Sequence, residues 1–229
     1  MRSSTADFKS GLVDIAPILI AYIPISMLWG TLAANKGLSP LESLLMSAFV
    51  YGGASQFVAI EMWRDPLPIV LMVVTVFVVN LRHALMSASI SRHLGDIPSR
   101  WHPVMMYFLT DEAWAIAERQ ALTRPLTLAY YLGVAAPLWP IWFGFTFVGA
   151  WLGSKLGDPA IIGLDFAFAA MFISILAGFW KGPRTGGVVI ISAVVAIAAK
   201  IYLPGAWYIV SGGLAGALVA AIFHSEVET

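Results

Sequence analysis

The chain contains no cysteine and few charged residues, and each shortage excludes a class of protein. Without cysteine there are no disulfides, no thiolate metal sites and no cysteine nucleophile. Only 11% of the 229 residues are charged, whereas a typical soluble domain has about 25%. Thirteen basic and thirteen acidic side chains give a net charge of zero, which does not indicate nucleic-acid binding. With 59% hydrophobic residues and a mean hydropathy of +0.83, the sequence is that of an integral membrane protein.

Motifs of enzymes and cofactor-binding proteins are also missing. The phosphate-binding pattern Gly-x-x-x-x-Gly-Lys does not occur. The four histidines, His83, His93, His102 and His224, lack the spacing of metal ligands. We therefore expect no metal, no cofactor and no enzymatic activity. The polar start, 1–10, and the absence of a small-residue cleavage pattern after it predict no removable signal peptide.

What the sequence does contain is a series of apolar runs joined by short polar turns. About 20 apolar residues cross a bilayer as a helix, and the runs that can form such helices are 12–34, 41–60, 66–91, 101–119, 126–151, 161–180, 185–199 and 206–223. We predict an all-α, polytopic membrane helical bundle of seven or eight transmembrane segments, forming a single transporter domain over 1–229. The count depends on 101–119, where Thr110, Asp111 and Glu112 require either an interfacial helix or a span that faces a polar cavity. We expect this segment to span.

Weak internal similarity suggests two repeats, 12–119 and 126–223. Three residues recur at the same spacing in the second half, where Gly149, Lys155 and Pro159 correspond to Gly30, Lys36 and Pro40. Chance recurrence in a chain rich in glycine and proline is the alternative. The repeats are parallel if 101–119 spans and inverted if it does not. Seven Lys and Arg residues on the N-terminal side of eight spans, against five on the other side, favour a cytoplasmic N-terminus.

The most unusual stretch is a polar interruption of the second apolar run, Tyr51-Gly52-Gly53-Ala54-Ser55-Gln56-Phe57. Paired glycines destabilise a helix because glycine reaches backbone angles closed to other residues. A helix broken within the membrane leaves N–H and C=O groups free, and many transporters bind their substrate at such a break. We therefore predict a broken helix and a substrate-binding role for Gly52, Gly53, Ala54, Ser55 and Gln56. The alternative is that these small residues only allow two helices to pack closely.

Several other polar side chains interrupt apolar surroundings, where an unpartnered charge is costly. Asn80 and Asp111 are further candidates for substrate binding, and Arg82, His83 and Glu112 are candidates for a coupling or structural ion pair. Arg82 can pair with either carboxylate simply to brace two helices. Adjacent residues on a helix point about 100° apart, so we expect the two carboxylates to differ, with Asp111 functional and Glu112 the brace.

Four motifs occur in an order and spacing that resemble a known family. They are Gly-Leu-Ser-Pro-Leu-Glu at 37–42, Gly-Ala-Ser-Gln-Phe at 53–57, Asn-Leu-Arg-His at 80–83 and Leu-Thr-Asp-Glu at 109–112. With them the chain resembles the AzlC family, the large subunit of bacterial branched-chain amino acid exporters. The resemblance implies a small AzlD-type membrane subunit as partner and a location in the bacterial cytoplasmic (inner) membrane. It also implies export of hydrophobic amino acids driven by the proton-motive force.

Three classes of function stay open at this point. The first is secondary active export of valine, leucine, isoleucine and methionine, in which N–H groups after Gly52 and Gly53 receive the substrate carboxylate and Asp111 receives the ammonium. The second is a passive channel or a membrane scaffold for a partner subunit, although rings of charge or carbonyl motifs typical of channels are not plain in the sequence. The third is an intramembrane enzyme, which lacks a nucleophile–base or metal signature. We expect an exporter.

Overall fold

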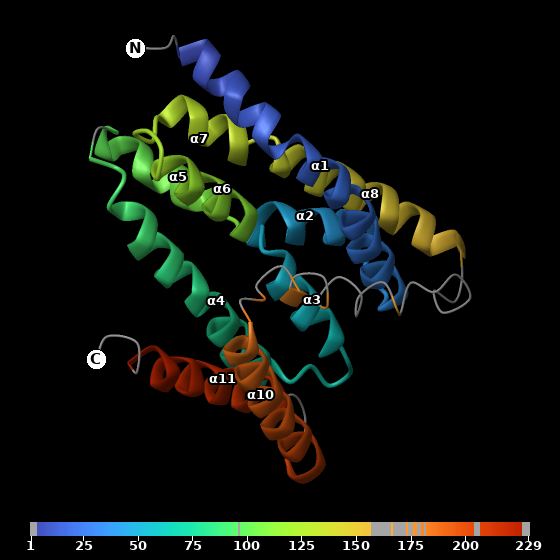
Figure 1. The fold of residues 1–229 in the computed structure, drawn as a ribbon. Helices are drawn as coiled ribbons and strands as arrows, with labels where there is room; N and C mark the ends of the chain where they lie inside the picture. Colours follow the sequence, from blue (N-terminus) through green and yellow to red (C-terminus); the bar gives the residue numbers. More distant parts are fainter. Residues whose placement is uncertain are drawn as a thin grey trace. The chain divides into compact units, whose positions relative to one another are not determined.

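The computed structural model describes residues 4–95, 97–156, 166, 173, 176–177, 180, 182–203 and 207–225. These residues form helices and no strand, as the sequence predicts (Figure 1). They belong to two compact units, the first within Met1–Phe57 and Asn80–Leu164 and the second within Val58–Val79 and Asp165–Thr229. The helices are α1 (Ser4–Asn35), α2 (Pro40–Val50), α3 (Gly53–Glu61), α4 (Ile69–Ser91), η1 (Ser99–Trp101), α5 (His102–Tyr107), α6 (Asp111–Ala121), α7 (Leu128–Ala135), α8 (Leu138–Leu156), α10 (Pro183–Tyr202) and α11 (Trp207–Ser225).

Four segments of the described chain are long and apolar enough to cross a membrane. They are α1, α4, the α7–α8 pair from Leu128 to Gly153, and α10. The predicted count of seven or eight segments is not confirmed. The predicted helix over 161–180 lies outside the described residues apart from isolated positions, and α11 contributes only a shorter apolar helix, Trp207–Ile222. The runs 41–60 and 101–119 are each divided into short helices.

The predicted break in the second run is confirmed, and it falls at Tyr51 and Gly52. α2 begins behind a capping box, in which Ser39 and Glu42 each accept a hydrogen bond from the other's backbone N–H. It ends at Tyr51, which has a left-handed conformation with φ of 39°, and α3 begins at Gly53. At about 1.5 Å per residue, neither the 11 residues of α2 nor the 9 residues of α3 cross a hydrocarbon core of about 30 Å.

The sequence predicts one spanning helix over 101–119, and the structure corrects this prediction. α5 ends at Tyr107, and α6 begins at Asp111. The cause is local, because the Thr110 hydroxyl accepts a hydrogen bond from the Ala113 N–H at 3.2 Å and so caps a new helix. Asp111 and Glu112 then occupy the first turn of α6, where the helix dipole favours carboxylates. With 11 residues, α6 is also too short to span.

In the first unit, α1 packs along α8 so closely that backbone meets backbone. A Cβ atom added to Gly30 would lie 2.1 Å from the Thr146 carbonyl oxygen, and one added to Gly149 would lie 2.1 Å from that of Met27. The Thr31 hydroxyl donates to the Gly149 carbonyl at 3.1 Å across the same contact. Glycine is therefore required at both positions, as in other close helix pairs of membrane proteins.

α1 runs parallel to α7 and α8. Gly133 of α7 lies against Phe8 near the start of α1, whereas Gly153 near the end of α8 lies against Thr31 near the end of α1. The recurring pair Gly30 and Gly149 meets in this contact, each glycine against the backbone of the other helix. Parallel repeats would place them in this way, whereas the division of 101–119 would make the repeats inverted, and the repeat itself stays a prediction.

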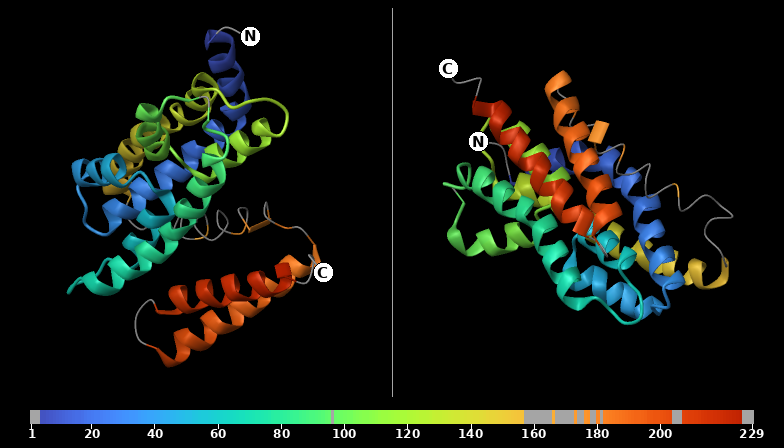
Figure 2. Two further views of the ribbon diagram at one scale, coloured as in Figure 1. Left: turned by 90° about the vertical axis from the view of Figure 1, so that its left-hand side faces the viewer. Right: turned by 90° about the horizontal axis from the view of Figure 1, so that it is seen from below.

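The second unit contains another close helix pair. α10 and α11 lie side by side in both views of Figure 2. A Cβ atom added to Gly212 would lie 2.9 Å from that of Ala196, and the Ser192 hydroxyl donates to the Gly212 carbonyl at 2.7 Å. Small residues therefore determine the spacing of this pair as well.

Replacing Gly30 with alanine tests the contact between α1 and α8. The new Cβ atom would meet backbone, which cannot rotate away, so the two helices must separate. We expect the purified protein to lose about 1–3 kcal/mol of stability and to melt at a lower temperature. Gly144→Ala, also in α8, is the matched control because its added Cβ atom meets nothing within 4 Å. Equal melting temperatures for the two variants would contradict this account.

Candidate functional site

The chain reverses direction between α2 and α3, which makes residues 40–57 a hairpin, called here the first hairpin. The Gln56 side-chain amide donates to the Ser47 hydroxyl at 3.0 Å, although nine residues of continuous helix would hold them about 13 Å apart. The Trp29 indole of α1 contacts both arms, donating to Ser47 at 2.9 Å and lying 6.0 Å from the Phe57 ring. The predicted break is therefore the tip of a hairpin and not a kink in a spanning helix.

A second reversal occurs between α4 and α6. Arg82 of α4 pairs with Asp111 of α6 at 2.5 Å, and seven residues later on both helices the Ser89 hydroxyl donates to Glu118. These two pairs show that α4 and α6 run parallel. Since α4 ends at Ser91, the chain must return to the level of Arg82 before α6 begins, and α5 lies in the returning arm. Residues 102–121 are called here the second hairpin.

The two hairpins come from opposite ends of α1. α6 begins beside the middle of α1, where the Tyr22 hydroxyl donates to Glu112 at 2.8 Å. It then leads to Thr127, whose hydroxyl donates to Asp7 near the start of α1 at 3.0 Å. The second hairpin is therefore based at the N-terminal end of α1, whereas the first hairpin follows directly from the C-terminal end of α1.

The tips of the two hairpins touch each other. The Tyr51 ring stacks on the Tyr107 ring with centroids 5.8 Å apart and meets the Phe108 ring edge-on at 6.1 Å. The Tyr107 hydroxyl donates to the Ala48 carbonyl at 2.7 Å. In Figure 1 the adjoining ends of α2 and α6 mark this place in the first unit. Helix ends, with their free backbone groups, thus come together at this place, where Tyr51 is buried and Tyr107 is exposed.

Polar side chains surround the meeting point. The structure shows which carboxylate pairs with Arg82, a question that the sequence left open. Arg82 pairs with Asp111 and not with Glu112, and both side chains of the pair are about one third exposed, at 35% and 31%. Glu112 instead accepts the hydrogen bond from Tyr22 of α1. The expectation that Glu112 is the brace for Arg82 is therefore wrong about the partner. His83, the next residue on α4, is partly buried.

Ser55 and Gln56 hold the first hairpin in place. The Ser55 hydroxyl donates to the Asn80 side-chain oxygen of α4 at 2.7 Å. Both ends of the buried Gln56 amide are used, since its oxygen accepts from the Trp142 indole at 3.0 Å and its nitrogen donates to Ser47. Gly53 lies against the same indole, because an added Cβ atom would stand 3.1 Å from the Trp142 ring. The predicted substrate-binding role of Ser55, Gln56 and Asn80 stays a prediction, and their visible role is support.

Four buried polar atoms around the site have no hydrogen-bond partner among the described residues. They are the Tyr51 hydroxyl, Nε of Arg82, Nδ1 of His83 and the indole nitrogen of Trp114. Leaving such a group unpaired costs about 1–3 kcal/mol. The Tyr51 hydroxyl is at the hairpin tip, close enough to Glu112 to interact with it electrostatically. An unpaired donor and a carboxylate at one place are the features expected of a ligand site.

Comparison with known proteins agrees with these features. The AzlC protein family model matches residues 17–156. The chain belongs to the AzlC family. Within the family it is 34% identical to the inner membrane protein YgaZ of Escherichia coli K12, over 77% of this chain and 75% of YgaZ. An uncharacterized membrane protein of Archaeoglobus fulgidus is 31% identical over 95% of this chain and 96% of its own length.

A more distant AzlC relative has a functional name. The branched-chain amino acid transport protein AzlC of Bacillus subtilis is 20% identical over 97% of this chain and 87% of its own length. No solved structure matches the chain. Family membership and four apolar helices make this an AzlC-type membrane protein of a transport-associated family.

Breaking the Arg82–Asp111 pair separates a structural role from a transport role. Arg82→Gln or Asp111→Asn leaves one charge without its partner, and because the pair is partly exposed we expect a loss of about 1–3 kcal/mol, less than for a fully buried pair. The double variant removes both charges and should recover membrane abundance. Asp65→Asn, in an exposed loop, is the control for loss of a carboxylate. Normal abundance and normal transport by Asp111→Asn would eliminate both roles.

Proposed function

We propose that this chain is a secondary active exporter of branched-chain amino acids, namely valine, leucine and isoleucine, and of methionine. It acts in the bacterial cytoplasmic (inner) membrane together with a small AzlD-type membrane subunit. The observation that carries the proposal is the meeting of two helical hairpins from opposite ends of α1, with ionisable groups around their tips. The name of the Bacillus subtilis relative, a branched-chain amino acid transport protein, supports the substrate class.

The charges at the site match those of a free amino acid. A zwitterion placed between Arg82 and Asp111 directs its carboxylate to the guanidinium and its ammonium to Asp111, so every charge keeps an opposite partner. The Arg82 Nε atom and the Tyr51 hydroxyl, which have no partner in the described chain, are further donors for the carboxylate. The N–H groups at the start of α3, from Gly53 to Ser55, are further donors of the kind that binds a carboxylate.

An apolar substrate side chain fits the remaining walls. The rings of Tyr51, Tyr107 and Phe108 form one aromatic group at the tips. Trp142 forms another surface beside Gly53. Such walls suit branched aliphatic side chains and methionine, whereas a charged side chain would lose its hydration without a partner. This is the basis for proposing hydrophobic amino acids as the transported class.

The contact between the tips also favours a carrier over the alternative, a passive channel. A pore needs a continuous polar path, but Tyr51 and Tyr107 are stacked where the hairpins meet. With one hairpin based at each end of α1, movement of either tip opens the site toward one side only. That arrangement supports alternating access, the usual mode of secondary transporters.

Gly53→Leu in reconstituted vesicles tests the proposed function. The larger side chain would push against Trp142 and fill the space at the tip, so we expect leucine export to fall about tenfold or more at normal membrane abundance. Gly144→Leu is the matched control, since its position faces open space. Wild-type vesicles that never move leucine, isoleucine or valine against a gradient would refute active export of these substrates. Full export by Gly53→Leu would instead reject the tip as the site.

The proposed partner is tested by expressing the chain with and without an AzlD-type small subunit. We expect the two chains to purify together and leucine export to require both, because the family resemblance implies a two-subunit exporter. An unrelated small membrane protein at equal expression is the control. Full export by this chain purified alone would show that no partner is needed.

A further inference from the structure

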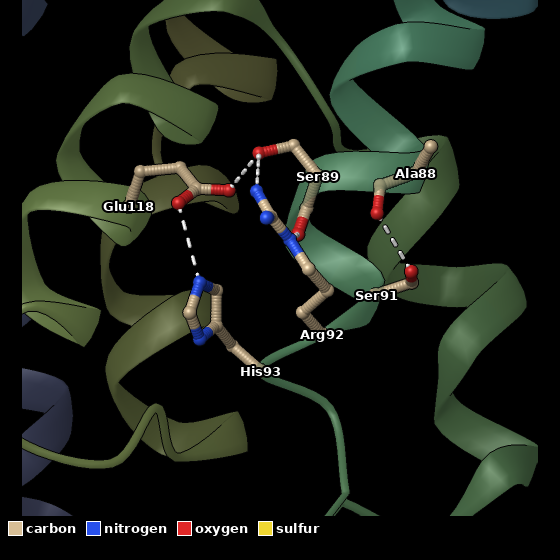
Figure 3. Close-up of polar contacts among 6 residues, drawn as sticks. All are labelled: Ala88, Ser89, Ser91, Arg92, His93 and Glu118. Atoms are coloured by element: carbon tan, nitrogen blue, oxygen red, sulfur yellow. Dashed lines mark hydrogen bonds and ion pairs between the residues drawn. The ribbon is translucent and has the colours of Figure 1, made fainter. Parts of the chain in front are cut away.

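A second ionisable cluster lies at the C-terminal ends of α4 and α6, away from the hairpin tips. Figure 3 shows the Glu118 carboxylate of α6 between Ser89 of α4 and His93, which lies two residues past the end of α4. One carboxylate oxygen accepts from the Ser89 hydroxyl, and the other lies 3.3 Å from Nε2 of His93. Arg92 contacts the same Ser89 hydroxyl, with its guanidinium 3.4 Å away.

This cluster and the Arg82–Asp111 pair belong to one seam between α4 and α6. Both contacts join residues that are 29 positions apart, so they lie on the same faces of two parallel helices. Seven residues separate them along each helix, which corresponds to about 10 Å. The Glu118 and His93 side chains are only 22% and 30% exposed. Ionisable groups placed along a seam in a membrane protein are costly and mark paths for ions or protons.

The cluster also has access to the outside of the first unit. A pocket of about 250 Å³ is lined by Arg92, His93, Gly95, Ala121, Pro125 and Leu126. His93 therefore contacts the pocket on one side and Glu118 on the other. Histidine is the side chain suited to exchanging protons with water at physiological pH.

We propose that His93 and Glu118 form the proton-binding site that couples proton movement to transport, with Ser89 holding the carboxylate. The inference rests on the proposed active export. A proton taken up from the pocket by the His93 imidazole passes from Nε2 to the nearer oxygen of Glu118. The imidazolium becomes neutral imidazole and the carboxylate becomes neutral carboxylic acid, and the reverse step releases the proton on the opposite side of the membrane after the exporter has changed the side to which it is open.

The link to the substrate is mechanical, because about 10 Å is too far for a proton to pass directly from Glu118 to Asp111. Neutralising Glu118 weakens its hold on Ser89 and on protonated His93. α6 is then held to α4 mainly at its first turn, where Asp111 pairs with Arg82. Proton binding at one end of α6 thereby changes how firmly the substrate-binding end is fixed.

Other charged groups near Glu118 do not replace His93 in this role. Just after α4, Arg92 contacts Ser89, and on α6 the next residue is Arg119. From α7, Tyr130 is close to Arg119 and Arg124, but its hydroxyl donates to Asp14 of α1 at 2.7 Å. Arginines keep their charge throughout physiological pH, which leaves His93 and Glu118 as the pair in contact that exchanges protons in this cluster.

The test compares two modes of leucine transport in vesicles that contain the exporter with its small subunit. One is net export driven by a proton gradient, followed together with proton flux by an internal pH dye. The other is exchange of labelled for unlabelled leucine without a gradient. Glu118→Gln keeps an acceptor for Ser89 but cannot take up a proton, so we expect driven export and leucine-dependent proton flux to fall about tenfold or more while exchange persists.

Two further variants keep the proposal testable if Glu118→Gln folds poorly. Ser89→Ala removes the group that holds the Glu118 carboxylate and His93→Gln removes the group that takes up the proton, so the pH profile of driven export should differ from that of the wild type in both variants. His102→Gln is the matched control, because that histidine bonds the Ile97 carbonyl at 3.0 Å and does not touch Glu118. Its pH profile should equal that of the wild type.

The outcomes separate this inference from the proposed function. No leucine export by the wild type refutes the exporter itself. Normal wild-type export, combined with unchanged proton flux in Glu118→Gln or unchanged pH profiles in the other two variants, overturns the proton site and leaves the exporter standing. Loss of exchange together with export, in all three variants, would also overturn it, because the cluster would then be only a brace between α4 and α6.

Discussion

The backbone contact between α1 and α8 is the interaction on which the first unit depends. With glycine at 30 and 149, the two helices come close enough for their side chains to act as one surface. Trp29 of α1 and Thr146 of α8 both contact Ser47 of the first hairpin. Trp142 of α8 holds the other arm of the first hairpin, α3, by donating to Gln56. A wider separation of α1 and α8 would pull these contacts apart and release the tip.

The hairpins give polar groups of a membrane protein partners within the chain. Short helices end where the other hairpin or α1 and α4 contact them, so charges at their ends pair with groups of neighbouring helices. The second hairpin has the most such contacts of the two. Carboxylates in the first turn of its helix α6 contact α1 and α4, and another carboxylate near the end of α6 contacts α4 again. One short helix therefore connects the hairpin tips with a region open to a pocket.

Local sequence predicts much of this arrangement, but it does not predict the two places where the chain reverses direction. Hydropathy predicts an all-helical membrane protein, and the paired glycines predict a break near Tyr51. The motifs also single out Arg82 and Asp111, which the structure brings together as an ion pair. Hydropathy counts 41–60 and 101–119 as spans, because an apolar hairpin and an apolar span have the same composition. Only contacts between distant residues, such as Gln56 with Ser47, reveal the difference. Tyr22 and Glu118 were missed because single polar residues in helices have no motif.

The capping box at the base of the first hairpin also limits how its length can change. Ser39 and Glu42 fix where α2 begins, and the contacts of Ser47 fix its rotation. One inserted residue would advance the tip by about 1.5 Å and turn it by about 100°, which moves Ser47 away from Trp29 and Tyr51 away from Tyr107. Related chains are therefore free to vary the loops between helices in length, whereas the count of residues from Ser39 to Tyr51 is fixed by geometry.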